Sequence, residues 1–284
     1  MTFLLDEIAL ATARLAEAGV PSPRTDAEEI AAHVHGVRRG RLHTVRDSDF
    51  DARFWEGVAR RAAREPLQHI TGVAYFRFLS LEVGPGVFVP RPETEVVVGW
   101  AIDRLREMDV ASPVVVDLGT GSGAIALSIA QEVALAQVHA VEIDPVAYGW
   151  AKRNVLELGQ GRTTLHPEDL ADCLPELDGK VDLVVSNPPY IPPGAVPRDP
   201  EVRLHDPAKA LYGSGDDGLD EVRAVERTAR RLLRPGGLVA VEHADQQGND
   251  VYWLFSEDRG WYDTRLRQDL TGRDRFVTAQ FGQD

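Results

Sequence analysis

One tetrapeptide combines side chains that together could hold a planar amino group: Asn187, Pro188, Pro189 and Tyr190. It follows residues 183–185, a short apolar run that is typical of a buried parallel strand. Because a residue before proline prefers extended backbone, Asn187 should project its amide beyond the carboxyl end of this strand. The prolines donate no N–H, so the loop offers two acceptors, the Asn187 side-chain oxygen and the Pro188 carbonyl, beside the Tyr190 ring. Such a pair suits a planar NH2 group with its two N–H bonds, although a simple proline-rich turn is the alternative interpretation.

A glycine-rich turn follows an earlier strand and forms a second candidate site. Residues 114–116, all valine, predict the strand, which runs into a turn that contains Gly119, Gly121 and Gly123. A helix beginning at Ala124 would direct its first amide groups toward a ligand. The glycine spacing satisfies the loose dinucleotide-binding pattern, so an NAD or FAD site is one interpretation. The next predicted strand, 137–142, ends in Glu142, and a carboxylate about 20 residues beyond such a turn can accept both hydroxyls of a ribose.

A third strand region ends near Asp169 and Leu170, an acid and an apolar residue that could flank an adenine. A glycine turn, a ribose-binding acid, an adenine-flanking acid and a polar tetrapeptide therefore follow one another along the chain. This arrangement resembles the S-adenosylmethionine-dependent methyltransferases more than it resembles the dehydrogenases. The tetrapeptide 187–190 is similar to that of methyltransferases acting on planar exocyclic or amide nitrogens. We therefore expect S-adenosylmethionine as the cofactor.

The first 72 residues predict a small helical bundle. Apolar residues recur at helical spacing from Leu4 to Ala18 and end before Gly19, a residue type common just past a helix end. A capping box at residues 25–28 predicts the start of a second helix. The apolar stripe of a third helix consists of Phe50, Phe54, Val58 and Ala62. The bundle has no catalytic constellation, so we expect residues 1–72 to dock a partner or shield the site, with a purely structural role as the alternative.

A linker at residues 73–92 should connect the bundle to a second domain. Residues 65–72 break the helical pattern, and residues 75–83 alternate as a short β-hairpin would. Two prolines then flank Arg91, and the second is well placed at the first turn of a helix. Arg91 and Thr94 stand in this constrained turn and are candidate substrate-binding residues, with a solvated loop as the alternative.

Strands and helices alternate from Pro113 onward, which predicts an α/β domain built on a parallel sheet, and we place this domain at residues 93–284. Beyond Asn187, residues 202–207 and 211–218 predict a polar, glycine-rich loop that could cover a substrate, with a plain surface loop as the alternative. Residues 219–233 predict a helix that Pro-Gly-Gly ends. A strand at 238–242 and a final pair of strands complete the sheet. The histidines, the cysteine and the carboxylates do not occur at the spacing of a metal site, and the sequence contains no Gly-x-Ser-x-Gly elbow. We expect no metal.

Composition limits the compartment and the partners. The 284 residues carry a formal net charge of −14, which argues against a broad nucleic-acid-binding face. A single cysteine, Cys173, excludes an internal disulfide and fits a reducing compartment. The first residues lack the positive segment of a signal peptide, and no apolar run reaches the roughly 18 residues that span a membrane. We expect a cytoplasmic protein that binds neither a membrane nor nucleic acid directly.

The whole chain resembles the HemK/PrmC family, the bacterial peptide chain release factor glutamine methyltransferases. The resembling segments occur in order at residues 65–72, 90–95, 117–123, 186–191, 242–243 and 246–248. His69 stands where the family usually has tyrosine, and Glu142 where it often has aspartate, a change that keeps the carboxylate. The resemblance implies a class I, Rossmann-like methyltransferase domain with seven strands, preceded by a helical domain. It also implies that the chain methylates the glutamine of the Gly-Gly-Gln loop in class-1 release factors.

The resemblance implies a role for each candidate residue. The catalytic residues would be Asn187, Pro188 and Tyr190. The cofactor-binding residues would be Asp117, Gly119, Thr120, Gly121, Ser122, Gly123, Glu142, Asp169, Leu170 and Asn187. The substrate-binding residues would be Arg91, Thr94, Asn187, Pro188, Pro189 and Tyr190. Because a carboxamide nitrogen is a weak nucleophile toward an activated methyl group, we expect positioning by acceptors rather than by a strong base.

Two other functions would use the same residues. A flipped adenine would also present its exocyclic amine to Asn187, as in an N6-adenine methyltransferase, but the net acidity and the lack of a target-recognition domain argue against it. A nucleoside-binding regulator without catalysis would need only the glycine turn, and the presence of Asn187 and Tyr190 argues against that function. We expect a monomer.

Overall fold

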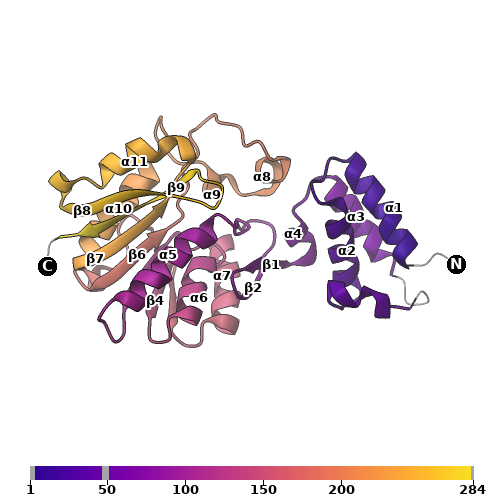
Figure 1. Cartoon of the computed structure of the whole chain (residues 1–284), viewed down its shortest axis with the longest axis horizontal. Coiled ribbons are helices and arrows are strands. Elements are labelled where there is room, and N and C mark those ends of the chain that lie inside the picture. The colour runs from indigo at the N-terminus through magenta and orange to yellow at the C-terminus, as the bar shows by residue number, and fades with distance from the viewer. Residues whose placement is uncertain (1–3, 47–50, 283–284) are drawn as a thin grey trace. The chain divides into compact units, whose positions relative to one another are not determined.

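The computed structural model describes residues 4–46 and 51–282 of the chain. These residues form two compact units, both drawn in Figure 1. The helical unit lies within residues 1–73, 83–85 and 196–206, and the sheet unit lies within residues 74–82, 86–195 and 207–284. Of the helices described, none is long and apolar enough to cross a membrane.

The helical unit consists of short helices around one apolar core. Its helices are α1 (Leu4–Glu17), α2 (Pro23–Val34), α3 (Arg53–Ala62), α4 (Leu67–Thr71) and α8 (Pro200–His205), with a 3-10 turn at η1 (Arg39–Thr44). Ile8, Ile30 and Phe54 are fully buried in its core, where apolar side chains at helical spacing come together. The predicted stripe residue Phe50 lies outside the described residues.

Three local predictions are wrong. The capping box predicted at residues 25–28 does not form, because α2 already begins at Pro23, whose fixed φ suits the first turn of a helix. Residues 65–72, predicted to be non-helical, contain α4. The predicted loop, residues 202–207 and 211–218, contains most of α8, which begins at Pro200, and the last residue of α9 (Ala208–Leu211), which follows Pro207.

Charged side chains join α8 to the rest of the helical unit. Arg61 on α3 pairs with Asp26 at 2.7 Å and with Glu201 at 2.9 Å, and Arg64 pairs with Glu201 at 2.7 Å. Arg61 and Asp26 are only 6% and 7% exposed, so each charge depends on its partner for compensation. The segment around Glu201 is therefore anchored in the helical unit, although the chain on either side of it belongs to the sheet unit.

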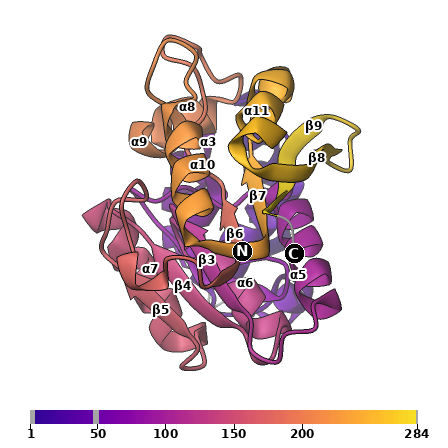
Figure 2. The same ribbon diagram turned by 90° about the vertical axis from the view of Figure 1, so that its left-hand side faces the viewer.

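The sheet unit contains a sheet of the order β5-β4-β3-β6-β7-β9-β8 (Figure 2). Its strands are β3 (Val114–Leu118), β4 (Gln137–Val141), β5 (Thr163–His166), β6 (Val181–Ser186), β7 (Leu233–Glu242), β8 (Trp261–Gln268) and β9 (Asp274–Phe281). Strands β3 to β7 pair in parallel, and β9 runs antiparallel to both of its neighbours. The predicted α/β domain with seven strands is confirmed.

Helices lie on both faces of this sheet. The helices of the sheet unit are α5 (Thr94–Glu107), α6 (Ala124–Glu132), α7 (Pro145–Leu158), α9, α10 (Asp220–Leu232) and α11 (Gly248–Leu254), with 3-10 turns η3 (Pro175–Leu177), η4 (Asp245–Gln247) and η5 (Glu257–Arg259). The chain advances from β3 to β5 toward one edge and from β6 to β7 toward the other. Right-handed crossovers in opposite directions place their helices on opposite faces. The predicted hairpin is a separate sheet of two strands, β1 (Val73–Phe76) and β2 (Leu79–Glu82).

This topology brings the candidate residues to one end of the sheet. β3 and β6 are neighbours whose crossovers run in opposite directions, and open α/β sheets bind ligands beyond the carboxyl ends of strands at such a switch point. The glycine turn follows β3, Glu142 follows β4, Asn187 follows β6, and Glu242 is the last residue of β7. All four groups therefore lie at the same end of the sheet, beyond the carboxyl ends of the parallel strands.

Candidate active site

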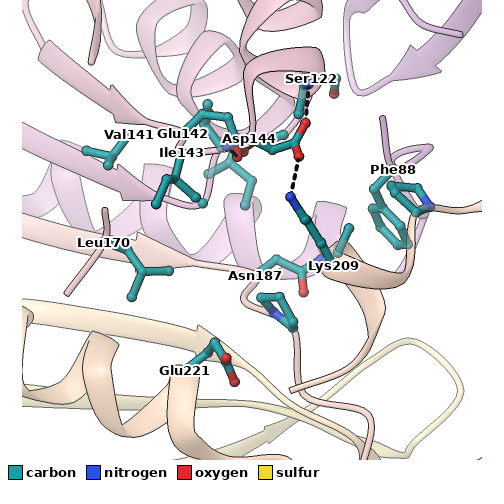
Figure 3. A pocket seen from close by; sticks show the side chains of 18 of the residues that line it. Phe88, Ser122, Val141, Glu142, Ile143, Asp144, Leu170, Asn187, Lys209 and Glu221 are labelled. Carbon is teal, nitrogen blue, oxygen red and sulfur yellow. Dashed lines mark hydrogen bonds and ion pairs between the residues drawn. The ribbon is translucent and has the colours of Figure 1, made fainter. Parts of the chain in front are cut away.

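A cavity of about 630 Å³ lies beyond these strand ends in the sheet unit (Figure 3). Its volume falls within the roughly 300–1,000 Å³ of small-molecule and cofactor sites. The predicted site residues that line it are Thr94, Gly119, Thr120, Gly121, Ser122, Glu142, Asp169, Leu170, Asn187 and Pro189. The predicted site residues that do not line it are Arg91, Asp117, Gly123, Pro188 and Tyr190.

The glycine turn exposes bare backbone to the cavity. Gly119 has a φ of +75° and Gly121 a φ of +58°, in the left-handed region that favours glycine. A Cβ atom built on Gly121 would have no atom within 4 Å, so the space above this residue belongs to the cavity and not to the protein core. The turn therefore suits a ligand that approaches the main chain closely.

Asp117 supports the turn from below. It is fully buried, and its Oδ2 accepts hydrogen bonds from Thr120 Oγ1 at 2.5 Å and from the Ala126 N–H at 3.1 Å. These bonds connect the end of β3 to the turn and to the start of α6. Burial raises the pKa of Asp117 to about 7, although both hydrogen bonds lower it. Its other oxygen, Oδ1, has no hydrogen-bond partner among the residues described.

Glu142 presents its carboxylate to the cavity. Its Oε2 accepts a hydrogen bond from the Gly121 N–H at 2.9 Å, and its Oε1 accepts one from the Asp144 N–H at 2.8 Å. Burial raises the pKa of Glu142, whereas these backbone hydrogen bonds lower it. Each carboxylate oxygen has a second lone pair, so both can still accept a hydroxyl group. The geometry suits a ribose at this position.

The cavity wall also contains residues that the sequence analysis did not single out. Figure 3 shows Ile143, Asp144 and Lys209 beside the cavity, with the Lys209 amine directed toward the Asp144 carboxylate at 3.4 Å. Asp144 caps α7, because its Oδ1 accepts hydrogen bonds from the N–H groups of Val146 and Ala147 at 2.9 and 3.1 Å. An aspartate directly before a proline is a common helix start, so this signal was present in the sequence. Lys209 had no such signal, since only the fold brings it to the cavity.

Asn187 belongs to a chain of hydrogen bonds that reaches the end of β7. Its Nδ2 donates to Thr94 Oγ1 at 3.3 Å, and Thr94 Oγ1 donates to Glu242 Oε2 at 2.7 Å. The Tyr190 hydroxyl donates to the other oxygen of Glu242 at 3.1 Å. Because the amide nitrogen of Asn187 faces Thr94, the side-chain oxygen is the atom that remains for a ligand.

The remaining predicted residues do not line the cavity but lie close to residues that do. Tyr190 packs against the apolar core of the sheet unit, and burial raises the pKa of its hydroxyl. Pro188 is buried. The Arg91 guanidinium lies 4.9 Å from the ring centre of Phe88, which itself lines the cavity. Gln247 holds the loop backbone, because its Nε2 donates to the Tyr190 carbonyl at 2.7 Å.

Comparison with known proteins identifies the family. The model of the PrmC N-terminal domain matches residues 8–72, and that of the methyltransferase small domain matches residues 101–210. A release factor glutamine methyltransferase from Streptomyces coelicolor is 63% identical over 281 residues, which cover 99% of this chain and 99% of its own. The chain belongs to the release factor glutamine methyltransferase family.

Two other relatives are more distant. One is named for a different substrate, and the other is similar in fold. A 4-amino-L-phenylalanine/4-methylamino-L-phenylalanine methyltransferase from Streptomyces pristinaespiralis is 42% identical over 90% of this chain and 87% of its own. A solved methyltransferase from Pyrococcus furiosus is 20% identical, with a TM-score of 0.52 over 72% of this chain and 90% of its own. This last likeness supports the fold alone.

Membership of the release factor glutamine methyltransferase family makes the chain a methyltransferase whose cofactor is S-adenosylmethionine. The cavity fits this cofactor in two respects that are independent of the comparisons. The bare backbone at Gly121 allows close approach, and the Glu142 carboxylate retains acceptors for two hydroxyl groups.

Proposed function

We propose that this enzyme methylates the side-chain amide nitrogen of the glutamine in the Gly-Gly-Gln loop of class-1 peptide chain release factors, and so supports translation termination. The observation that carries the proposal is the orientation of Asn187, whose nitrogen faces Thr94 while its oxygen remains available at the cavity. An acceptor at this point selects a substrate group that bears N–H bonds. The relative that is 63% identical over nearly the whole chain supports a release factor as the substrate.

The cofactor-binding roles follow the order of the strand ends. The residues that we assign to the cofactor are Asp117, Gly119, Thr120, Gly121, Ser122, Gly123, Glu142, Asp169, Leu170 and Asn187. Glu142 would accept the ribose hydroxyls, and Asp169 and Leu170 would flank the adenine. Asp117 and Gly123 do not line the cavity, so their contribution is to hold the shape of the turn.

The substrate amide would be held by two acceptors. When bound, the cofactor supplies a sulfonium methyl group that is already strongly activated. Asn187 Oδ1 and the Pro188 carbonyl would accept the two N–H bonds of the glutamine amide, orient its nitrogen toward the methyl carbon and stabilise the positive charge that develops on it. The glutamine nitrogen would take the methyl group in exchange for one amide proton, which would pass to water. Pro189 and Thr94, which line the cavity, would complete the substrate site, and Tyr190 and Arg91 would support it from outside the lining.

The domains would divide recognition from transfer. We assign residues 1–72 to recognition of the release factor, residues 73–92 to the linker, and residues 93–284 to methyl transfer. We also propose that the enzyme acts in the cytoplasm, where its substrate takes part in translation. One copy of the chain supplies every residue named for the cavity, so we propose that a monomer is sufficient. The net charge of −14 supports a protein substrate without direct nucleic-acid binding.

A second candidate substrate is a free aromatic amine. The relative that is 42% identical and is named for 4-amino-L-phenylalanine favours it. The amino group of such a compound is conjugated with a ring, so it presents two N–H bonds in nearly one plane, as a carboxamide does. The same acceptors would therefore suit both groups.

Transfer of label from S-adenosylmethionine separates these functions. The enzyme is incubated with labelled cofactor and, in separate reactions, with a class-1 release factor, the same factor with its Gly-Gly-Gln glutamine replaced by asparagine, an oligonucleotide, and 4-amino-L-phenylalanine. We expect label on the first substrate alone, at the glutamine. Label on the oligonucleotide or on the amino acid in preference to the release factor would overturn the proposal.

A further inference from the structure

We propose that Glu242, acting through Thr94, is a positioning residue that determines which atom of the Asn187 amide faces the substrate. The inference rests on the proposed function, because it explains how the acceptor assigned to Asn187 is kept in place. Thr94, in α5, and Glu242, at the end of β7, stand far apart in the sequence and meet only in the folded sheet unit.

The position of Glu242 suits this role. The end of β7 lies beside the end of β6, since Val241 is paired with Ser186, the residue before Asn187. Glu242 is only 2% exposed, and each of its carboxylate oxygens accepts one hydrogen bond, from Thr94 at 2.7 Å and from Tyr190 at 3.1 Å. One buried carboxylate therefore contacts Tyr190 directly and Asn187 through a single hydroxyl group.

The number of available hydrogens fixes which group donates and which accepts in the hydrogen bonds that join Asn187, Thr94 and Glu242. A threonine hydroxyl has one hydrogen, and an ionised carboxylate can only accept, so the hydrogen of Thr94 is donated to Glu242. The Thr94 oxygen is then left as an acceptor, which only the nitrogen side of the Asn187 amide can satisfy. The amide oxygen must face the other way.

Without this constraint the Asn187 amide could turn by half a rotation about its last side-chain bond. The two ends of an amide group have almost the same shape, so sterics alone distinguish them poorly. A turned amide would direct its own N–H bonds at the N–H bonds of the substrate, and two donors repel. The loop backbone does not depend on Thr94, since Gln247 and the Ile191 to Leu211 hydrogen bond hold it separately. Loss of the Thr94 hydroxyl should therefore affect the amide more than the loop.

The direction of these hydrogen bonds depends on whether Glu242 is ionised. Burial raises the pKa of Glu242 to about 7. The hydrogen bonds from Thr94 and Tyr190 and the charge of Arg275 on β9 lower this pKa. The charge of Glu93, before α5, raises it. Arg275 is itself paired with Asp269 at 3.0 Å. A protonated Glu242 can donate to Thr94, which frees the hydrogen of Thr94 to be donated to the Asn187 oxygen. The Asn187 oxygen would then no longer be available to the substrate. Methyl transfer should therefore be fast above the pKa of Glu242 and should slow as the pH falls through that pKa.

The first test compares two substitutions at one position. Thr94→Val keeps the shape of the side chain and removes the hydroxyl group, whereas Thr94→Ser keeps the hydroxyl group. Thr278→Val is the matched control, because it removes another buried hydroxyl, which lies on β9, accepts a hydrogen bond from Arg267 on β8 and does not line the cavity. With saturating cofactor we expect single-turnover methylation of the release factor to slow on the order of 10-fold to 100-fold in Thr94→Val, as for other losses of orientation. Thr94→Ser should recover most of the rate.

The second test follows the same rate across the neutral pH range. The wild-type rate should fall toward acidic pH, and this fall should disappear in Glu242→Gln, which cannot ionise, and in Thr94→Val, where the connection to Asn187 is cut. If Glu242 only stabilised the folded protein, the rate of Thr94→Val would still decrease toward acidic pH. Either that result or a wild-type rate in Thr94→Val would overturn the inference. A wild-type enzyme that leaves the release factor unlabelled would instead overturn the proposed function.

Discussion

At the scale of single residues, three buried acids at the strand ends differ in what they face. Glu142 faces the cavity and retains free lone pairs, Asp117 binds the turn and α6, and Glu242 binds Thr94 and Tyr190. Burial raises the pKa of all three carboxyl groups. Their substitution should therefore have different consequences, although all three carboxyl groups lie at the carboxyl ends of the parallel strands.

Glu142→Ala should weaken cofactor binding without unfolding the protein. The substitution removes the acceptors of both ribose hydroxyls, and hydrogen bonds to a charged group contribute roughly 1.5 to 3 kcal/mol. Calorimetry with S-adenosylmethionine measures the change in dissociation constant, and Glu257→Ala, at an exposed glutamate on η5, is the control. An unchanged constant in Glu142→Ala would place the ribose elsewhere.

Asp117 should make the stability of the cofactor-free protein fall as the pH rises. Its pKa in the folded state is raised from 3.8 to about 7, so between these values the folded state holds a proton that the unfolded state has lost. The free energy of unfolding should then decrease by up to about 1.4 kcal/mol per pH unit across this window. Asp117→Asn cannot ionise and should lack this contribution. Urea unfolding of both proteins at about pH 5 and about pH 7 tests the difference, and equal slopes would contradict it.

At the scale of elements, the sequence predicts regular segments better than the contacts between them. β3 and β6 were predicted from apolar runs, and Glu142 from its distance beyond the glycine turn, because these signals are local. The short helix α8 was not predicted, since its segment is held by ion pairs of Glu201 with residues of α3 and the turn after it. The contact of Thr94 with Glu242 has a separation of 148 residues and no sequence signal. Tyr190, expected as a wall of the site, does not line the cavity, and its hydroxyl group donates a hydrogen bond to Glu242.

The glycine turn allows a matched comparison. Gly121 and Gly161 both have positive φ, and a Cβ atom on either would meet nothing within 4 Å, but only Gly121 lines the cavity. Alanine at each position should therefore introduce a similar backbone strain of about 1 to 2 kcal/mol. Only Gly121→Ala should also lower the affinity for S-adenosylmethionine, by at least about 10-fold, since its methyl group would enter the ligand space. Equal affinities in the two variants, measured by calorimetry, would show that the cofactor does not approach this turn.

At the scale of the whole molecule, the chain passes between the two units more than once. The segment 196–206 leaves the sheet unit after the tetrapeptide, packs in the helical unit and returns at residue 207. Its Glu201 is paired with Arg61 and Arg64. A protein bound to the helical unit would thus be connected through a short stretch of chain to the loop that bears Asn187.

Removal of residues 1–72 should separate recognition from transfer. The shortened chain should bind S-adenosylmethionine and methylate a short Gly-Gly-Gln peptide, but should lose most methylation of the intact release factor. Glu201→Gln should be included in the shortened chain, because the truncation removes both arginine partners of Glu201. Circular dichroism must confirm that the shortened chain is folded. Full activity on the intact release factor would show that the helical unit does not recognise it.

Single-turnover methylation of a release factor by Asn187→Ala, at saturating cofactor, tests the central assignment most directly. The substitution removes one of two acceptors beside the developing charge, and the loss of one such preorganised contact typically costs on the order of 100-fold to 1,000-fold in rate. Cofactor affinity should fall far less. Asn187→Asp, which keeps the acceptor, should retain more activity than Asn187→Ala. We predict this order of rates; transfer by Asn187→Ala at nearly the wild-type rate would mean that other residues hold the substrate amide and would contradict the assignment.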